Sequence, residues 1–161
     1  VLNGKVEIGF VGFKNSETRL SFEKIWQDEM VLTVPSAHPW TRRKSVELTD
    51  LRSEQFISRE RGSGTLDSFR HLISKGRRSA NDLLSVAMEL GSTAAVKEAL
   101  IAGFGISILS RVSVERELAE GLLAEIPIRQ LKMIRDFYEV CYKGRPLSPV
   151  AQAFREFVKS K

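Results

Sequence analysis

Hydroxyl-bearing residues gather at two places where an apolar strand gives way to a helical pattern. The first loop offers Ser58, Ser63, Gly64 and Thr65, and the second spans residues 91–93, Gly-Ser-Thr. Backbone N–H groups at the start of a helix, together with nearby hydroxyls, donate hydrogen bonds that suit a small anion. The same residue types are also ordinary helix caps. The sequence therefore predicts two capped helices, and these caps can also face a ligand.

Other catalytic and metal-binding patterns are missing. Two histidines and one cysteine are too few for a zinc site of the usual spacing. No nucleophile elbow, zinc-protease helix or Walker loop occurs, and Gly62-Ser-Gly64 lacks the Gly-Lys-Ser/Thr that completes a phosphate loop. Glu60 and Glu89 are the acids nearest the two loops, and no histidine accompanies them. We expect no metal, no cofactor and no enzymatic activity.

Length and composition indicate one globular domain. The 161 residues are 42% hydrophobic, and no apolar run reaches the roughly 20 residues that span a bilayer. A single cysteine, Cys141, fits a reducing compartment, so we expect a cytoplasmic protein without a membrane partner. The net charge is +5, with basic clusters at 42–44 and 75–78. These clusters suit solvated loops or an anionic small ligand, or alternatively a nucleic-acid contact.

Strand and helix patterns alternate along the chain. Strands are expected at 5–10, 20–27, 29–34, 55–58, 83–90, 106–109, 122–128 and 134–142. Helices are expected at 45–51, 66–76, 92–102, 112–120 and from Pro149 onward, where Ser148 is the N-cap and Val150, Phe154, Phe157 and Val158 form an apolar stripe. This alternation indicates an α/β fold. Breaks at 35–39 and 129–133 predict two crossings between lobes, with one lobe inserted in the other.

Several segments together resemble a known family. They are Val6-Glu-Ile-Gly-Phe10, the run from Asp28 to Pro39, the run from Phe56 to Thr65, the run from Met88 through Gly103-Phe-Gly-Ile to Ser110, and Leu147-Ser-Pro149 with its helix. In this order they resemble the effector-binding domain of LysR-type transcriptional regulators.

The resemblance implies the fold of type II periplasmic binding proteins, with two α/β lobes joined by two crossover strands. The first lobe would comprise residues 1–35 and 130–161, the second residues 36–129, and the first lobe would be incomplete. The implied function is to bind a small, anionic effector in the cleft between the lobes. The implied partners are other copies of the chain, in a homodimer or tetramer, and DNA only through an N-terminal winged helix-turn-helix absent from this chain. The chain also lacks an initiator Met, as expected for a fragment.

The resemblance also assigns ligand-binding residues. Ser58, Ser63, Gly64 and Thr65 correspond to the family loop that faces the cleft. Phe10, Val11 and Gly12 correspond to a turn of the other lobe, and Arg42 follows the first crossing, where it could reach the rim. An effector that binds one arrangement of the lobes more tightly shifts the equilibrium toward it.

Two other functions fit the same architecture. A solute-binding protein of a transport system would need an export signal and a complete first lobe. An enzyme would need a convergent acid, base or nucleophile in the cleft. A partial first lobe would expose a sheet edge and apolar faces, so we also expect self-association.

Overall fold

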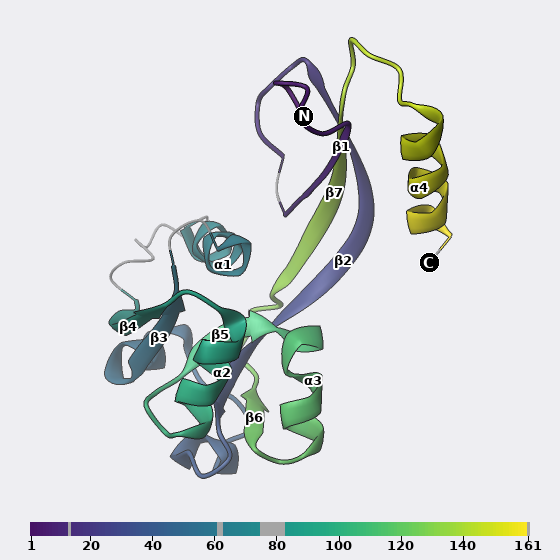
Figure 1. Ribbon diagram of the computed structural model, residues 1–161. Helices are drawn as coiled ribbons and strands as arrows, with labels where there is room; N and C mark the ends of the chain where they lie inside the picture. The colour runs from purple at the N-terminus through teal and green to yellow at the C-terminus, as the bar shows by residue number, and fades with distance from the viewer. Residues whose placement is uncertain (13, 61–62, 75–82, 161) are drawn as a thin grey trace. The chain divides into compact units, whose positions relative to one another are not determined.

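The computed structural model describes residues 1–12, 14–60, 63–74 and 83–160 (Figure 1). The chain divides into two compact units. Unit 1 comprises Val1–Gln27 and Asp136–Lys161, and unit 2 comprises Asp28–Arg135, so unit 2 is inserted in unit 1. The boundaries differ from those expected at residues 35 and 129, because Pro35 ends a strand that began in unit 1. Among the described residues, no helix combines the length and apolar character needed to cross a membrane.

Strand β2 (Leu20–Pro35) runs without a break through both units. We expected two strands here, because polar residues near position 28 interrupt the apolar pattern. The strand changes neighbours along its length instead, pairing with β7 (Ile134–Tyr142) and also with β5 (Ser107–Ser110) and β6 (Leu123–Ile126). Each stretch of β2 therefore has different neighbours, and its apolar and polar residues do not alternate regularly along the whole strand.

In unit 1, β1 (Ile8–Val11) pairs antiparallel with β7, with Ile8 opposite Cys141 and Val11 opposite Tyr138. Helix α4 (Pro149–Lys159) follows β7 in the chain. Its start is as predicted: the Ser148 hydroxyl accepts a hydrogen bond of 3.3 Å from the N–H of Ala151. Of its apolar stripe only Val158 is buried, and Val150, Phe154 and Phe157 are exposed.

In unit 2, β2 pairs with β5 and β6 in one sheet, and β3 (Gln55–Arg59) and β4 (Ser85–Leu90) form a two-stranded sheet beside it. Strands β5 and β6 pair antiparallel with β2, and β3 pairs parallel with β4. Phe56 forms a parallel bridge with Ile106, and the Ser107 hydroxyl donates to the Ile57 carbonyl at 2.7 Å. These bonds join β3 to the start of β5, so the two sheets meet there.

Helices cover both faces of these strands. Alternate residues of β2 point to opposite faces, so Leu32 belongs to one apolar cluster and Val31 to another. The first cluster holds the inner face of α1 (Gly64–Ser74), and the second holds that of α2 (Thr93–Ile101) and α3 (Arg111–Ala119). The helix expected at 45–51 is the short 3₁₀ helix η2 (Leu48–Ser53), and the stop expected at Gly76 lies outside the described residues.

Gly105 fixes the approach of β5 to β3. Its φ is +155°, and a Cβ at this position would lie 2.1 Å from the carbonyl oxygen of Gln55. Only glycine fits there without moving the backbone. The Gly-x-Gly-Ile motif therefore places β5 beside β3, where the loops at the strand ends carry the candidate site.

Candidate functional site

The first loop joins the end of β3 to the start of α1. Ser58 is 2% exposed, and its hydroxyl donates to the carbonyl of Arg59 at 2.8 Å, so this hydroxyl serves the backbone. Ser63 accepts at its carbonyl from the N–H of Asp67 at 3.0 Å, which opens the helix. Gly64 and Thr65 are the first two residues of α1, and both are half-buried. Their N–H groups belong to the first turn of a helix, which has no preceding turn to bond to.

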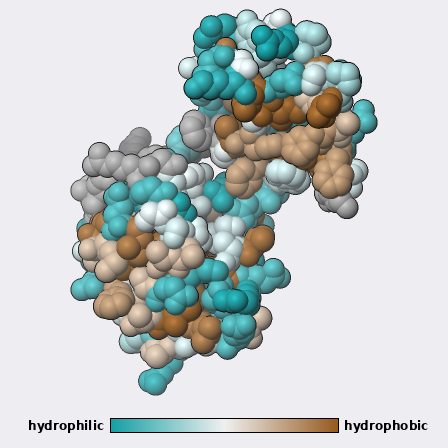
Figure 2. All heavy atoms as spheres, in the orientation of Figure 1, coloured by the Kyte–Doolittle hydropathy of each residue, from teal (hydrophilic) through white to brown (hydrophobic). Residues whose placement is uncertain are grey.

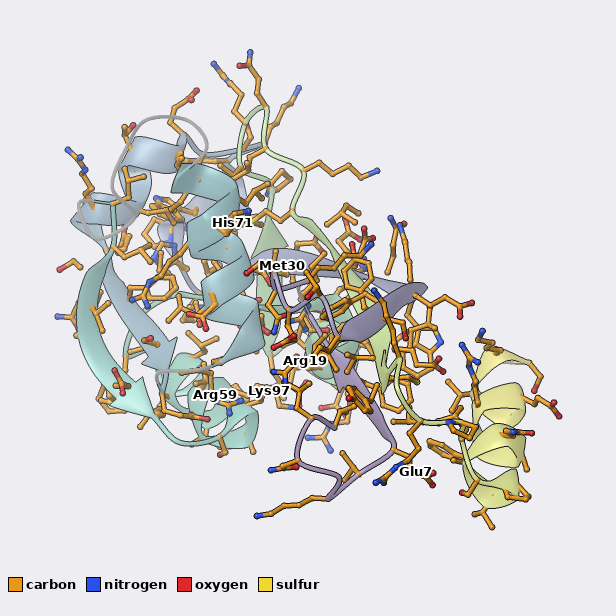
Figure 3. All side chains as sticks on the ribbon, turned by 90° about the horizontal axis from the view of Figure 1, so that it is seen from above. Glu7, Arg19, Met30, Arg59, His71 and Lys97 are labelled. Carbon is orange, nitrogen blue, oxygen red and sulfur yellow. The ribbon has the colours of Figure 1, made fainter. Side chains whose placement is uncertain are left out.

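The second loop lies directly against the first. The N–H of Glu60 donates to the carbonyl of Leu90 at 3.1 Å, and the Arg59 guanidinium donates to the Thr93 hydroxyl at 2.6 Å. Ser92 caps α2 by accepting from the N–H of Ala95 at 3.1 Å. Figure 3 shows Arg59 near the ends of β3 and β4, beside α2. The two hydroxyl-rich loops are therefore neighbours, but the second uses both its hydroxyls on the protein itself.

Arg59 and Glu60 form an ion pair at the start of the first loop. The guanidinium donates to the two carboxylate oxygens at 2.8 and 2.5 Å. These hydrogen bonds from Arg59 hold the pKa of Glu60 at about 2, well below the ordinary value of 4.5. The carboxyl is therefore ionised at neutral pH and is not a general acid.

Three further residues meet where the chain enters and leaves unit 2. Arg135 donates through Nε and Nη2 to one oxygen of Asp28, at 2.7 and 2.6 Å, and the Ser110 hydroxyl donates to the other oxygen at 2.8 Å. The Arg135 side chain is 11% exposed and that of Asp28 is 8% exposed. We call Asp28, Ser110 and Arg135 the crossing cluster. The Nη1 atom of Arg135 lies 3.7 Å from the position that a Cβ on Gly64 would occupy, so the cluster reaches the start of α1.

Sequence reasoning did not find the crossing cluster. Asp28 and Arg135 are 107 positions apart, and neither sits in a recognisable motif. The available signal was one acidic and one basic residue at the two points where the chain passes between lobes.

The three predicted residues of unit 1 lie at the end of β1. Phe10 and Val11 are strand residues rather than turn residues, and Gly12 follows them. The Phe10 ring stacks on Trp26 at 5.6 Å between centroids and meets Phe154 edge-on at 6.2 Å. Phe10 therefore contacts two aromatic rings of its own unit although it is exposed, and the ligand role of these three residues stays a prediction.

Arg42 lies away from the loop residues. It is exposed at the end of the 3₁₀ helix η1 (Pro39–Arg42), which follows the far end of β2. From Asp28 to Pro35 the strand covers about 23 Å at its usual rise of about 3.3 Å per residue. The structure therefore brings Gly64, between Ser63 and Thr65, close to Arg135 of the crossing cluster and does not bring Arg42 there.

Within the described ranges, no group of three or more His, Cys, Asp and Glu residues could hold a metal ion. His38 caps the turn at Pro39 instead: its Nδ1 atom accepts from the N–H of Trp40 at 3.2 Å.

Comparison with known proteins shows which family this chain belongs to. The LysR substrate binding domain family matches residues 1–161. The HTH-type transcriptional regulator MJ0300 of Methanocaldococcus jannaschii is 34% identical over 156 residues, covering 96% of this chain and 52% of that protein. The transcriptional activator CmpR of Synechocystis is 31% identical over 156 residues, covering 97% of this chain and 50% of that protein. The chain spans about half the length of these curated relatives.

Two solved structures share the fold. The regulatory domain of Synechocystis CcmR, in complex with 2-PG, superposes with a TM-score of 0.84 at 28% identity, covering 99% of this chain and 74% of that one. The effector-binding domain of QuiR, in complex with shikimate, gives a TM-score of 0.81 at 21% identity, covering 99% and 73%. The two-unit α/β architecture is that of type II periplasmic binding proteins, and the chain belongs to the LysR substrate-binding domain family.

Proposed function

We propose that this chain is the effector-sensing domain of a LysR-family transcriptional regulator, and that it binds a small anionic metabolite at the start of α1. The observation that supports this most directly is the meeting of three features at Gly64: the first turn of a helix, the hydroxyl-bearing Thr65 and the Arg135 guanidinium. Backbone N–H groups and a fixed cation together favour an oxyanion over a neutral ligand. The structural relatives of this fold include domains solved with 2-PG and with shikimate.

The wider setting follows the family. We infer that DNA is bound by a separate N-terminal segment of the longer regulator, in the cytoplasm, and that the domain self-associates as a homodimer or tetramer. An apolar surface on unit 1, formed by Phe10, Trp26, Val150, Phe154 and Phe157, supports self-association (Figure 2). The names of the relatives, all transcriptional regulators, favour this function over transport or catalysis.

A thermal-shift panel tests the sensing function. Sulfate, phosphate, shikimate and other carboxylates would be added to the purified chain, because a ligand that binds only the folded state raises the melting temperature. At least one anion is expected to do so. A panel in which no anion changes the melting temperature would count against a site for anions in this chain.

The variant Thr65→Val then tests the location. The methyl of valine keeps the shape of threonine but removes the hydroxyl, so the affinity for the anion identified in the panel should fall about tenfold, the loss of one hydrogen bond to a charged group. Thr49→Val is the matched control, because Thr49 is exposed on η2. Equal affinities for the two variants, measured by calorimetry, would place the ligand elsewhere.

A further inference from the structure

We infer that one face of α4 docks against α4 of a second copy of this chain, in an antiparallel pair about a two-fold axis. The inference rests on the self-association included in the proposed function, and it adds the surface and the symmetry. This face consists of Val150, Ala153, Phe154 and Phe157, and we call it the α4 face.

The spacing of the α4 face is typical of a helix surface that packs against another element. Its residues stand at positions i, i+3, i+4 and i+7, which lie on one side of an α-helix. Yet Val150 is 80% exposed, Phe154 is 49% exposed and Phe157 is 59% exposed. The helix buries Val158, which lies on another side. The α4 face therefore has the composition of a buried surface but is open to solvent.

Ion pairs hold the helix that carries this face. Arg155 pairs with Glu23 of β2 at 2.8 Å and with the buried Glu139 of β7 at 2.7 Å. Lys159 also pairs with Glu23, at 2.6 Å. Because α4 is already held, it loses little entropy when it docks. Because these cations already have carboxylate partners, they favour an apolar partner over an acidic one.

The apolar surface around the α4 face is large enough for a dimer. Phe10 and Trp26, which are 38% and 41% exposed, extend it, since Phe10 stacks on Trp26 and meets Phe154 edge-on (Figure 2). Together with Phe157 and Val150, these rings leave about 500 Å² of apolar side chain exposed in each copy. Two copies would cover about 1,000 Å², which is about the smallest area of a specific protein–protein interface.

The α4 face is complementary to itself in the antiparallel direction. With the two-fold axis between residues 153 and 154, Phe154 faces the small Ala153 of the second copy. In the same way, Phe157 faces Val150 of the second copy. The exposed Glu156 then lies beside the first turn of the other helix, where the helix dipole favours a negative charge. Both the sizes and the charges of these side chains therefore suit a second copy.

Light scattering and sedimentation of the purified chain test the inference. We expect a dimer whose population rises with protein concentration. Phe154→Glu should weaken dimerisation at least tenfold, because it places a charge without a partner at the centre of an apolar interface. Phe104→Glu is the matched control. Phe104 is 55% exposed and belongs to unit 2, so this variant should dimerise like the wild type.

An engineered cysteine tests the symmetry, and it also serves if Phe154→Glu fails to fold. Ala153 lies beside the inferred two-fold axis, so Ala153→Cys should form a disulfide between two copies when oxidised glutathione is added. Ala119→Cys, at the exposed last residue of α3, should not. The native Cys141 is buried and should not compete.

Each other outcome overturns the inference. A wild-type chain that is monomeric at every concentration would assign the α4 face to a segment of the longer regulator or to another protein. A dimer that survives Phe154→Glu, or that Phe104→Glu weakens equally, would place self-association elsewhere. Failure of Ala153→Cys to crosslink would exclude the antiparallel pair. The anion thermal-shift panel, repeated on Phe154→Glu, separates the two proposals, because the proposed anion site lies in unit 2 and does not include α4.

Discussion

The guanidinium of Arg59, at the end of β3, donates a hydrogen bond of 2.6 Å to the hydroxyl of Thr93, the first residue of α2. This bond joins the loop that precedes α1 to the loop that precedes α2. The Arg59 side chain also donates to Glu60 through its two other nitrogens, so it binds both its neighbour Glu60 and the distant Thr93. The arrangement of the two loops therefore depends on a side chain that carries no recognisable motif.

Replacing Arg59 by methionine should raise the pKa of Glu60. In the wild type, hydrogen bonds from Arg59 hold this pKa at about 2, against an ordinary 4.5. Because the folded-state pKa is the lower one, the pair stabilises the fold fully above pH 4.5, and this contribution is lost as the pH falls toward 2. Arg59→Met should remove that dependence, and a carboxyl NMR titration would follow it. The internal control is Glu17 in unit 1, whose pKa Arg19 holds at about 2. The pKa of Glu17 should not change in the Arg59→Met variant.

Substituting Gly105 by alanine should disrupt unit 2. The added methyl would lie 2.1 Å from the carbonyl oxygen of Gln55, at a φ of +155°. We expect a loss of about 3 kcal/mol or more in the free energy of unfolding, measured with urea. Gly91→Ala is the control, since nothing lies within 4 Å of its Cβ position. Similar urea midpoints for the two variants would contradict the close approach of β5 to β3.

Ser148→Ala should loosen α4. The hydroxyl caps the helix at Ala151 and also donates to Glu7 at 2.6 Å, and the Ser148 N–H donates to the same carboxylate at 3.0 Å. Loss of the cap costs about 1 kcal/mol. The pKa of Glu7, lowered mainly by the Ser148 hydroxyl, should rise at the same time. Ser16→Ala, at an exposed position, should change neither quantity in denaturation and NMR titration.

Lys97→Met should destabilise the pair of helices on one face of unit 2. Lys97 lies 2.8 Å from Oε1 of Glu117 and donates to the carbonyl of Ser113 at 3.1 Å, which connects α2 to α3. Glu117 is 1% exposed, so the variant leaves a buried carboxylate with a weaker partner, at a cost of about 3 kcal/mol.

Two comparisons make this result interpretable. Adding Glu117→Gln should recover most of the loss, and Lys132→Met, at an exposed position, should cost little. The pKa of Glu117 is lowered chiefly by the Lys97 hydrogen bond, so in the wild type this stabilisation falls as the pH drops below 4.5. A Lys97→Met variant as stable as the wild type at neutral pH would show that the pair contributes nothing.

Local signals made much of the fold predictable. Ser92 and Ser148 marked the starts of α2 and α4, and the expected strand at 134–142 has the bounds of β7. These features depend on residues within a few positions of one another. The hydroxyl-rich loops could be found for the same reason, since caps and strand ends are local.

The rest depended on contacts between distant residues. The unbroken course of β2 is set by β7, β5 and β6, which follow it by dozens of residues. The ion pair of Asp28 and Arg135 exists because two strands meet, and neither residue carries a local signal. Arg42 belongs to a basic run next to a proline turn, and its position beyond the far end of β2 became visible only in three dimensions.

The insertion of one unit in the other has a consequence for the order of folding. Unit 1 is assembled from two pieces separated by the 108 residues of Asp28–Arg135. Bringing the pieces together across an unfolded chain of that length costs about 4 kcal/mol of closure entropy. Once unit 2 has folded, its first and last residues are already bonded to each other, and β2 and β7 leave it as neighbours. Unit 2 should therefore fold first, and the pairing of β2 with β7 in unit 1 should follow from it.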